Sequence, residues 1–425
     1  MKRHSNIAVL IGLVAGAVLG ITANATLAGT PFLAGFIESF ADPAGKIFLR
    51  LLLMLVIPLV FAGLANAIAS FELRDLGKLG LKTLAYTVVV STIAVLIGIA
   101  FVNLFQPGVG LSDTARAALT EAAAKNKAAF ASAAAPPSGI AMLISIVPEN
   151  PFKAAATGDM LAVMFFALFF GIGLALTRTA SSEKLREVLE GLFDVSMRLI
   201  GVVIRLAPIG VGALVFTMTA RLGTDILAAL AKYVLVVVGA LALHQFGVYS
   251  LSVALLARRS PLRFFADIRL AMLTAFSTAS SNATLPTAID VAEKNLRLPP
   301  RVARFVLTIG AIGNQNGTAL FEGVTVLFLA QLYGIDLSLS QQITVVGVAI
   351  LGGIGTAGVP AGSLPVVMML LGMVGVPAEG IGMILGVDRF LDMCRTTLNV
   401  TGDLAAAVVV ARGYEPPTEK TEPAS

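Results

Sequence analysis

Apolar residues recur along the chain in runs of about 20, the length at which a helix spans a bilayer core. Charged or turn-forming residues bound the runs, which predict spans at 7–21, 46–70, 79–105, 155–177, 189–218 and 230–256. Less regular apolar segments follow at 264–291, 302–333, 342–376 and 378–412. The pattern predicts an all-α polytopic membrane protein.

Two of the later segments are interrupted in a way that predicts re-entrant hairpins. Hydroxyl side chains and Pro286 interrupt residues 277–286, whereas glycines and Pro360 interrupt residues 352–362. Irregular backbone at membrane depth is tolerated only where it is buried or lines a cavity. Each interruption precedes a span with a polar centre, so a hairpin and a broken span occur twice, which favours inverted repeats with a binding site between them. Ordinary kinked helices are the alternative.

The last apolar segment, residues 378–412, carries charges on one face. Spacings of three and four place a polar set within about 100° of a helix surface; the set is Asp388, Asp392, Arg395, Thr396, Asn399 and Asp403. One charge at mid-membrane costs about 2.5 to 3.5 kcal/mol, so this face must contact protein, water or ligand. Three aspartates against Arg395 leave two negative charges, and we expect a cation to complete the site. A purely structural ion-pair network is the alternative.

Composition and charge support this interpretation. The chain is 57% hydrophobic and 13% charged, and its net charge of +5 comes largely from Lys and Arg between the apolar runs. This distribution predicts cytoplasmic N- and C-termini and argues against nucleic-acid binding. The first run, followed by Ala23-Asn24-Ala25, could instead be a secretory signal. The chain has a single cysteine, Cys394, which excludes an internal disulfide. Residues 106–149 are predicted to form an outer connection, and residues 413–425 a disordered tail.

Four motifs in order carry a family resemblance. They are the serine-rich stretch at 280–286, Asn-Gln-Asn-Gly-Thr at 314–318, the glycine-rich stretch at 355–360 and the polar helix at 388–403. Together they resemble the glutamate/aspartate transporter family, the dicarboxylate/amino acid:cation symporters. The resemblance implies eight transmembrane helices, two re-entrant hairpins and a homotrimer in a bacterial or archaeal cytoplasmic membrane.

The resemblance also implies an elevator mechanism with a scaffold and a moving transport domain. The implied division is scaffold at 1–78 and 107–222, the latter including the outer loop, transport domain at 79–106 and 223–412, and a cytoplasmic tail at 413–425. The second hairpin would be the outer gate. Such a protein is a transporter and not an enzyme, and it needs no cofactor apart from its coupling cations.

For substrate, the resemblance implies that Arg395, supported by Thr318, binds a side-chain carboxylate, Asp392 the amino group and Asn399 the α-carboxylate. A planar guanidinium suits a carboxylate, and a carboxylate suits an ammonium group. The pocket would be completed by Ser281, Thr356, Gly358 and Thr396. Because both Arg395 and Asp392 are present, an acidic amino acid is the expected substrate, with C4-dicarboxylates and neutral amino acids as alternatives.

For cations, the family's first sodium site is matched by Gly310, Asn314, Asn399 and Asp403. Its second is matched by backbone carbonyls near Ile312, Gly353, Ile354 and Thr356. A third family site is not matched: its aspartate is Asn316 here and its Thr-Ser pair is Val90-Ser91, while Gln315 replaces the motif's methionine. We therefore expect fewer coupled sodium ions than in relatives with the full set.

Glu322 follows Thr318 by one helical turn and is the candidate proton carrier. A carboxyl group shielded from water can exchange protons near neutral pH. The alternative is a hydrogen-bonded glutamate with no role in transport. Two rival functions remain open from sequence: an intramembrane aspartyl protease built on Asp388 and Asp392, and an anion channel or receptor on the same scaffold.

Overall fold

The chain is described here by a computed structural model covering residues 3–69, 79–110, 119, 147–157, 159–177, 179–355 and 363–414. Every regular element within these ranges is a helix, which confirms the predicted all-α class. Four helical stretches are long and apolar enough to cross a membrane: Pro31–Asn66, Leu81–Phe105, Ala180–Leu222 and Asp225–Leu256. Most of the predicted outer connection, and the tail from residue 415, lie outside these ranges.

The described part of the N-terminal half consists of long helices and several short ones. They are α1 (Arg3–Leu27), α2 (Pro31–Phe36), η1 (Ile37–Ala41), α3 (Asp42–Leu53), α4 (Val56–Ala69), α5 (Leu81–Phe105), α8 (Pro151–Thr157), α9 (Met160–Leu176) and α10 (Ala180–Leu222). The second predicted span began at residue 46, but the helical run begins at Pro31 because Pro31 and Asp42-Pro43 occupy helix starts, where proline is compatible with helical geometry. The fifth span is also longer than predicted.

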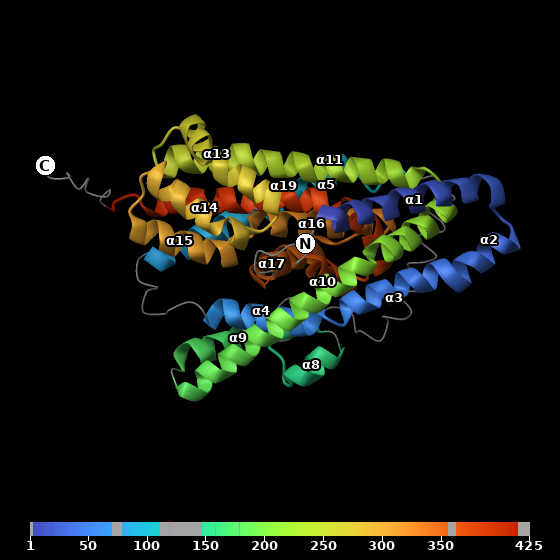
Figure 1. Cartoon of the computed structure of the whole chain (residues 1–425), viewed down its shortest axis with the longest axis horizontal. Helices are drawn as coiled ribbons and strands as arrows, with labels where there is room; N and C mark the ends of the chain where they lie inside the picture. Colours follow the sequence, from blue (N-terminus) through green and yellow to red (C-terminus); the bar gives the residue numbers. More distant parts are fainter. Residues whose placement is uncertain are drawn as a thin grey trace, which may run out of the picture.

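Helices α1 and α10 pack with their backbones close together. A Cβ atom at Gly12 or Gly16 would overlap the backbone of Pro208 or Gly212. Small residues allow this approach, and van der Waals packing then holds the pair within a bilayer. In Figure 1, α10 runs obliquely across the molecule, past α9 and α4 to α1.

The sixth span contains two wide turns. Helix α11 (Asp225–Leu243) continues through η3 (His244–Val248), α12 (Tyr249–Leu251) and η4 (Ser252–Leu256), of which η3 and η4 are π-helical. Such turns inside α-helices occur frequently at functional sites. Here they set the direction of the buried side chains of Gln245 and Tyr249, which both reach α19.

The first predicted hairpin is present. Helices α13 (Pro261–Thr278) and α14 (Ser281–Lys294) pack against each other across a turn at Ala279 and Ser280. Ala279 has a φ of 48°, and the Ser280 hydroxyl caps α14 by accepting a hydrogen bond from the Ala283 amide at 3.2 Å. The hydroxyl-rich stretch therefore ends one helix and starts the next.

The remaining elements are α15 (Pro300–Gly313), α16 (Asn316–Leu332), α17 (Leu339–Gly355), α18 (Ser363–Met373), η5 (Ala378–Gly380) and α19 (Ile381–Val410). The seventh span breaks at Asn314 and Gln315, as predicted, and α17 and α18 pack together as the arms of the second hairpin. The prediction of a second broken span is wrong, because α19 runs unbroken for 30 residues. Its polar side chains have partners on neighbouring helices, and the helical hydrogen bonds of α19 are not interrupted.

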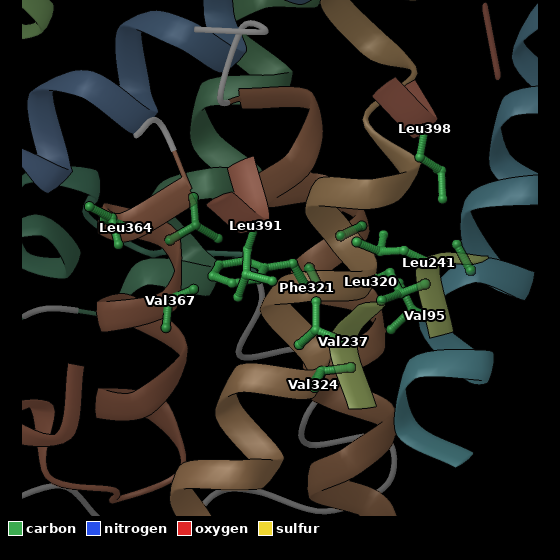
Figure 2. Close-up of a cluster of buried hydrophobic side chains, with 14 of the residues drawn as sticks. Val95, Val237, Leu241, Leu320, Phe321, Val324, Leu364, Val367, Leu391 and Leu398 are labelled. Atoms are coloured by element: carbon green, nitrogen blue, oxygen red, sulfur yellow. The ribbon is translucent and has the colours of Figure 1, made fainter. Parts of the chain in front are cut away.

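Helix α19 lies inside the C-terminal half of the molecule. It contacts α11, α13, α14, α15 and α16, and Figure 1 shows it surrounded by these helices. Figure 2 shows apolar side chains of α5, α11, α16 and α18 meeting side chains of α19 itself; they include Val95, Val237, Leu241, Leu320, Phe321, Val324, Leu364, Val367, Leu391 and Leu398. The apolar side of α19 is thus packed into the core through residues such as Leu391 and Leu398.

Candidate functional site

All six polar residues predicted to share one face of α19 are buried. Asp388, Asp392, Arg395, Thr396, Asn399 and Asp403 are each at most 5% exposed. A helix this polar on one face is buried only if its charges are paired or hydrogen-bonded. The partners therefore decide what the site can bind.

Arg395 is the centre of the first cluster. Its Nη1 lies 2.8 Å from Asp388 Oδ1, and its Nη2 lies 3.0 Å from Asp392 Oδ1. Its guanidinium also stacks on Phe321 of α16, with Cζ 4.2 Å from the ring centroid. Two carboxylates and one aromatic face fix the plane of the guanidinium, which suits recognition of a planar carboxylate.

Arg389 was missing from the expected charge count. It lies one turn before Asp392, and its Nη1 is 3.6 Å from Asp392 Oδ2. The face therefore carries three aspartates and two arginines, and the expectation of two uncompensated negative charges was wrong. The i,i+3 spacing of Arg389 and Asp392 was the signal available in the sequence.

Asn399 joins α19 to the break between α15 and α16. Its Oδ1 accepts a hydrogen bond from the Gly317 amide at 2.7 Å, and its Nδ2 donates to Gln315 Oε1 at 2.6 Å and Thr318 Oγ1 at 3.2 Å. Gln315 also donates from Nε2 to the Ala311 carbonyl at 3.1 Å. Thr318 therefore contacts Asn399, and its hydroxyl makes no hydrogen bond to Arg395.

The residues expected at the first sodium site lie together. Asn314 donates from Nδ2 to Asp403 Oδ1 at 2.9 Å, and its own Oδ1 is buried with no hydrogen-bond donor among the described residues. Gly310 lies so close to Asp403 that a Cβ there would be 2.8 Å from Cγ of the aspartate. A carboxylate, an amide oxygen and broken-helix carbonyls are the oxygen ligands that a hard cation prefers.

The second expected sodium site is described in part. Ile312 is in the last turn of α15, and Gly353 of α17 faces the same break, since a Cβ at Gly353 would lie 3.4 Å from the Gln315 carbonyl oxygen. Ile354 belongs to α17. Thr356 and Gly358 lie outside the described residues, so their expected contacts are untested.

Asn316 is held in a hydrogen-bonded chain of neutral groups. Its Oδ1 accepts from the Ser91 hydroxyl of α5, and its Nδ2 donates to the Tyr249 hydroxyl at 2.9 Å. Tyr249 in turn donates to the Leu398 carbonyl at 3.2 Å. Val90 is buried beside Ser91 and offers no oxygen. These groups satisfy one another without an ion, and Tyr249 is a partner that the sequence did not reveal.

Glu322 is completely buried, and neither carboxyl oxygen has a hydrogen-bond partner in the part of the chain that the structure describes. A Cβ at Gly352 of the second hairpin would lie 3.4 Å from Glu322 Oε2. The expectation of a hydrogen-bonded glutamate is therefore not supported. The group lies where it contacts a hairpin arm.

The two remaining pocket residues are buried. Ser281 begins α14 at 2% exposure, and its hydroxyl has no partner among the described residues. Thr396 adjoins Arg395 on α19. The aspartyl-protease geometry is not formed, because Asp388 and Asp392 are on one helix and bind one guanidinium in place of sharing a proton.

Comparison with known proteins identifies the family and relatives of this chain. Residues 6–413 match the model of the sodium:dicarboxylate symporter family. The chain is 36% identical over 401 residues to the proton/sodium-glutamate symport protein of Bacillus caldotenax, covering 93% of this chain and 92% of the relative. It is 36% identical over 380 residues to the proton/glutamate-aspartate symporter of Escherichia coli (strain K12), covering 88% and 86%.

A more distant relative is also matched over most of its length. Excitatory amino acid transporter 3 of Homo sapiens is 29% identical over 446 residues, covering 95% of this chain and 85% of the relative. The family match, the apolar helices and the buried charged helix point to one kind of molecule. This chain belongs to the sodium:dicarboxylate symporter family of membrane transporters.

Proposed function

We propose that this protein is a secondary active symporter that takes up an acidic amino acid with sodium ions, protons or both. The observation that carries the proposal is the buried Arg395, held between Asp388 and Asp392 in a family of symporters. The names of relatives such as the Bacillus caldotenax and Escherichia coli proteins specify glutamate or aspartate.

In the proposed complex, the substrate's side-chain carboxylate pairs with Arg395, its ammonium with Asp392 and its α-carboxylate with Asn399. The fixed guanidinium plane supports this arrangement, because a carboxylate can form two parallel hydrogen bonds to it. Thr318 supports Asn399, to which it is hydrogen-bonded at 3.2 Å. Ser281, Thr356, Gly358 and Thr396 complete the proposed pocket.

Sodium ions would bind at the break between α15 and α16. The unpaired Oδ1 of Asn314 beside Asp403 supports the first site. The second would use carbonyls of Ile312, Gly353, Ile354 and Thr356. Glu322 would carry a proton. Binding of a cation next to Asn399 would favour binding of the substrate anion, which couples the two fluxes.

The proposal includes a homotrimer working by an elevator mechanism, with the scaffold and transport domains divided as the resemblance implies. Both termini would face the cytoplasm, as the positions of Lys and Arg favour. Cysteine pairs between α1 and α19, which contact each other through Leu13 and Gly386, would test the movement. Cross-linking there should arrest uptake if α19 slides past α1.

Uptake by proteoliposomes tests the substrate. Labelled aspartate should accumulate under an inward sodium or proton gradient, and unlabelled aspartate or glutamate should compete better than succinate or serine. Preferential competition by succinate or serine would support the C4-dicarboxylate or neutral amino acid alternative. Exchange of labelled for unlabelled substrate across vesicles without a gradient would separate alternating access from a channel.

A further inference from the structure

Arg389 is the charged residue of this site to which neither the family motifs nor the proposed mechanism gives a role. It precedes Asp392 by one turn of α19, and its side chain is 28% exposed. Its Nε and Nη1 are buried and donate no hydrogen bond to any residue that the structure describes. Buried guanidinium donors without acceptors are unfavourable, so their retention calls for an explanation.

The two arginines contact different oxygens of one carboxylate. Arg395 Nη2 lies 3.0 Å from Asp392 Oδ1, whereas Arg389 Nη1 lies 3.6 Å from Asp392 Oδ2. The second separation exceeds ordinary hydrogen-bond length. Arg389 therefore neutralises Asp392 while retaining two donors for a closer contact.

Binding of an anionic substrate would bring a further carboxylate to Arg395. In the structure both of its Nη groups are occupied, one by Asp388 and the other by Asp392. A substrate carboxylate that pairs with Nη2 therefore competes with Asp392 for this nitrogen. If Asp392 is displaced, this buried carboxylate loses its nearer guanidinium, which is unfavourable for a buried charge.

We propose that Arg389 is a positioning residue that holds Asp392 while Arg395 exchanges Asp392 for the substrate carboxylate. Asp392 then stays oriented toward the substrate's ammonium group. The free donors of Arg389 take up the carboxylate that Arg395 releases, so one ion pair is replaced by another. This inference rests on the proposed function, because it assigns Arg395 and Asp392 to an acidic amino acid.

The test is calorimetric binding of aspartate to the purified full-length protein in detergent. Arg389→Gln should weaken aspartate binding about tenfold or more, because it removes the guanidinium that holds Asp392 during the exchange. Arg389→Lys keeps the charge and should bind within about threefold of wild type. The matched control is Arg186→Gln, which removes an exposed i,i+4 pair with Glu190 on α10 and should leave binding unchanged.

Melting temperatures of the substrate-free variants separate positioning from simple structural support. An unchanged melting temperature together with weakened aspartate binding supports the inference. Binding by Arg389→Gln within twofold of wild type would overturn it, as would a loss that Lys does not rescue or a loss that parallels lower melting temperature. If wild-type protein binds neither aspartate nor glutamate, the proposed function itself has failed. Tight wild-type binding with no effect of Arg389→Gln refutes only the role of Arg389.

Discussion

Gln315 Oε1 accepts a hydrogen bond of 2.6 Å from Asn399 Nδ2, which ties the break in the seventh span to the charged helix. The same glutamine donates to the Ala311 carbonyl at 3.1 Å. Both side chains are buried, so Gln315 fixes the position of the amide of Asn399, the proposed ligand of the substrate's α-carboxylate. The family motif has methionine at this position, so this chain orients its asparagine by a contact that the motif does not provide.

Gln315→Met should lower the unfolding free energy by about 1 to 3 kcal/mol, because a buried N–H and a buried carbonyl lose their partner. Aspartate should then raise the melting temperature by more than in wild type, since its carboxylate replaces the lost acceptor. Differential scanning fluorimetry with and without aspartate measures both effects. Gln341→Met, at an exposed helix start, is the control. Wild-type stability in the Gln315 variant would contradict the role of Gln315 in connecting Asn399 to Ala311.

Arg395→Ala should abolish recognition of aspartate and glutamate. The substitution removes the substrate's counter-ion and leaves Asp388 and Asp392 without their shared guanidinium. A broken buried pair costs about 3 to 5 kcal/mol, which exceeds a 100-fold loss of affinity. Uptake into proteoliposomes is the measurement, with Arg186→Ala as control. Acidic substrate taken up at wild-type affinity would refute the assignment of Arg395.

Asp392→Asn should separate amino acids from plain dicarboxylates. The neutral amide attracts ammonium weakly, so aspartate affinity should fall by about 2 kcal/mol or more, with a smaller change for succinate. Competition of both ligands against labelled aspartate gives the two values. Asp290→Asn, which breaks an exposed pair with Lys294, should change neither. Equal losses for aspartate and succinate would show that Asp392 serves the fold alone.

Asn316→Asp combined with Val90→Thr should steepen the sodium dependence of uptake. The wild-type chain of Ser91, Asn316 and Tyr249 is satisfied without an ion, whereas the double variant brings a charge and a hydroxyl to the same place. Asn316→Asp alone is the control. The reversal potential of wild-type flux measures stoichiometry, because each net charge adds about 2.3 kcal/mol per 100 mV. A wild-type reversal potential that requires three coupled sodium ions would show that the third sodium site is present after all.

Glu322→Gln should fold as well as wild type and lose the pH dependence of uptake. The carboxyl oxygens have no hydrogen-bond partner among the described residues, so the substitution breaks no hydrogen bond there. Uptake measured at several external pH values, at fixed sodium, tests this. Phe328→Leu, a buried change further along α16, controls for effects on packing. An unchanged pH profile would show that Glu322 carries no proton.

The sequence by itself determined the class of protein and which residues share the polar face of α19. Helical periodicity is a local property, so spacings of three and four placed Asp388 and Arg395 together, and apolar runs predicted the spans. Hydroxyl residues and Pro286 likewise predicted the turn at Ala279, because they act on neighbouring backbone, and the polar centre at 314–318 predicted the break after Gly313.

Only the tertiary structure decided which groups pair across helices. Gln315 is 84 residues from Asn399, and Tyr249 reaches the Leu398 carbonyl from a π-helical span, so no spacing rule applied. The continuity of α19 was also decided by its surroundings: neighbouring helices pair its polar groups, and no carbonyl had to be released for them. Arg389 was visible in the sequence, but its two unpaired buried donors became apparent only once the helices were packed.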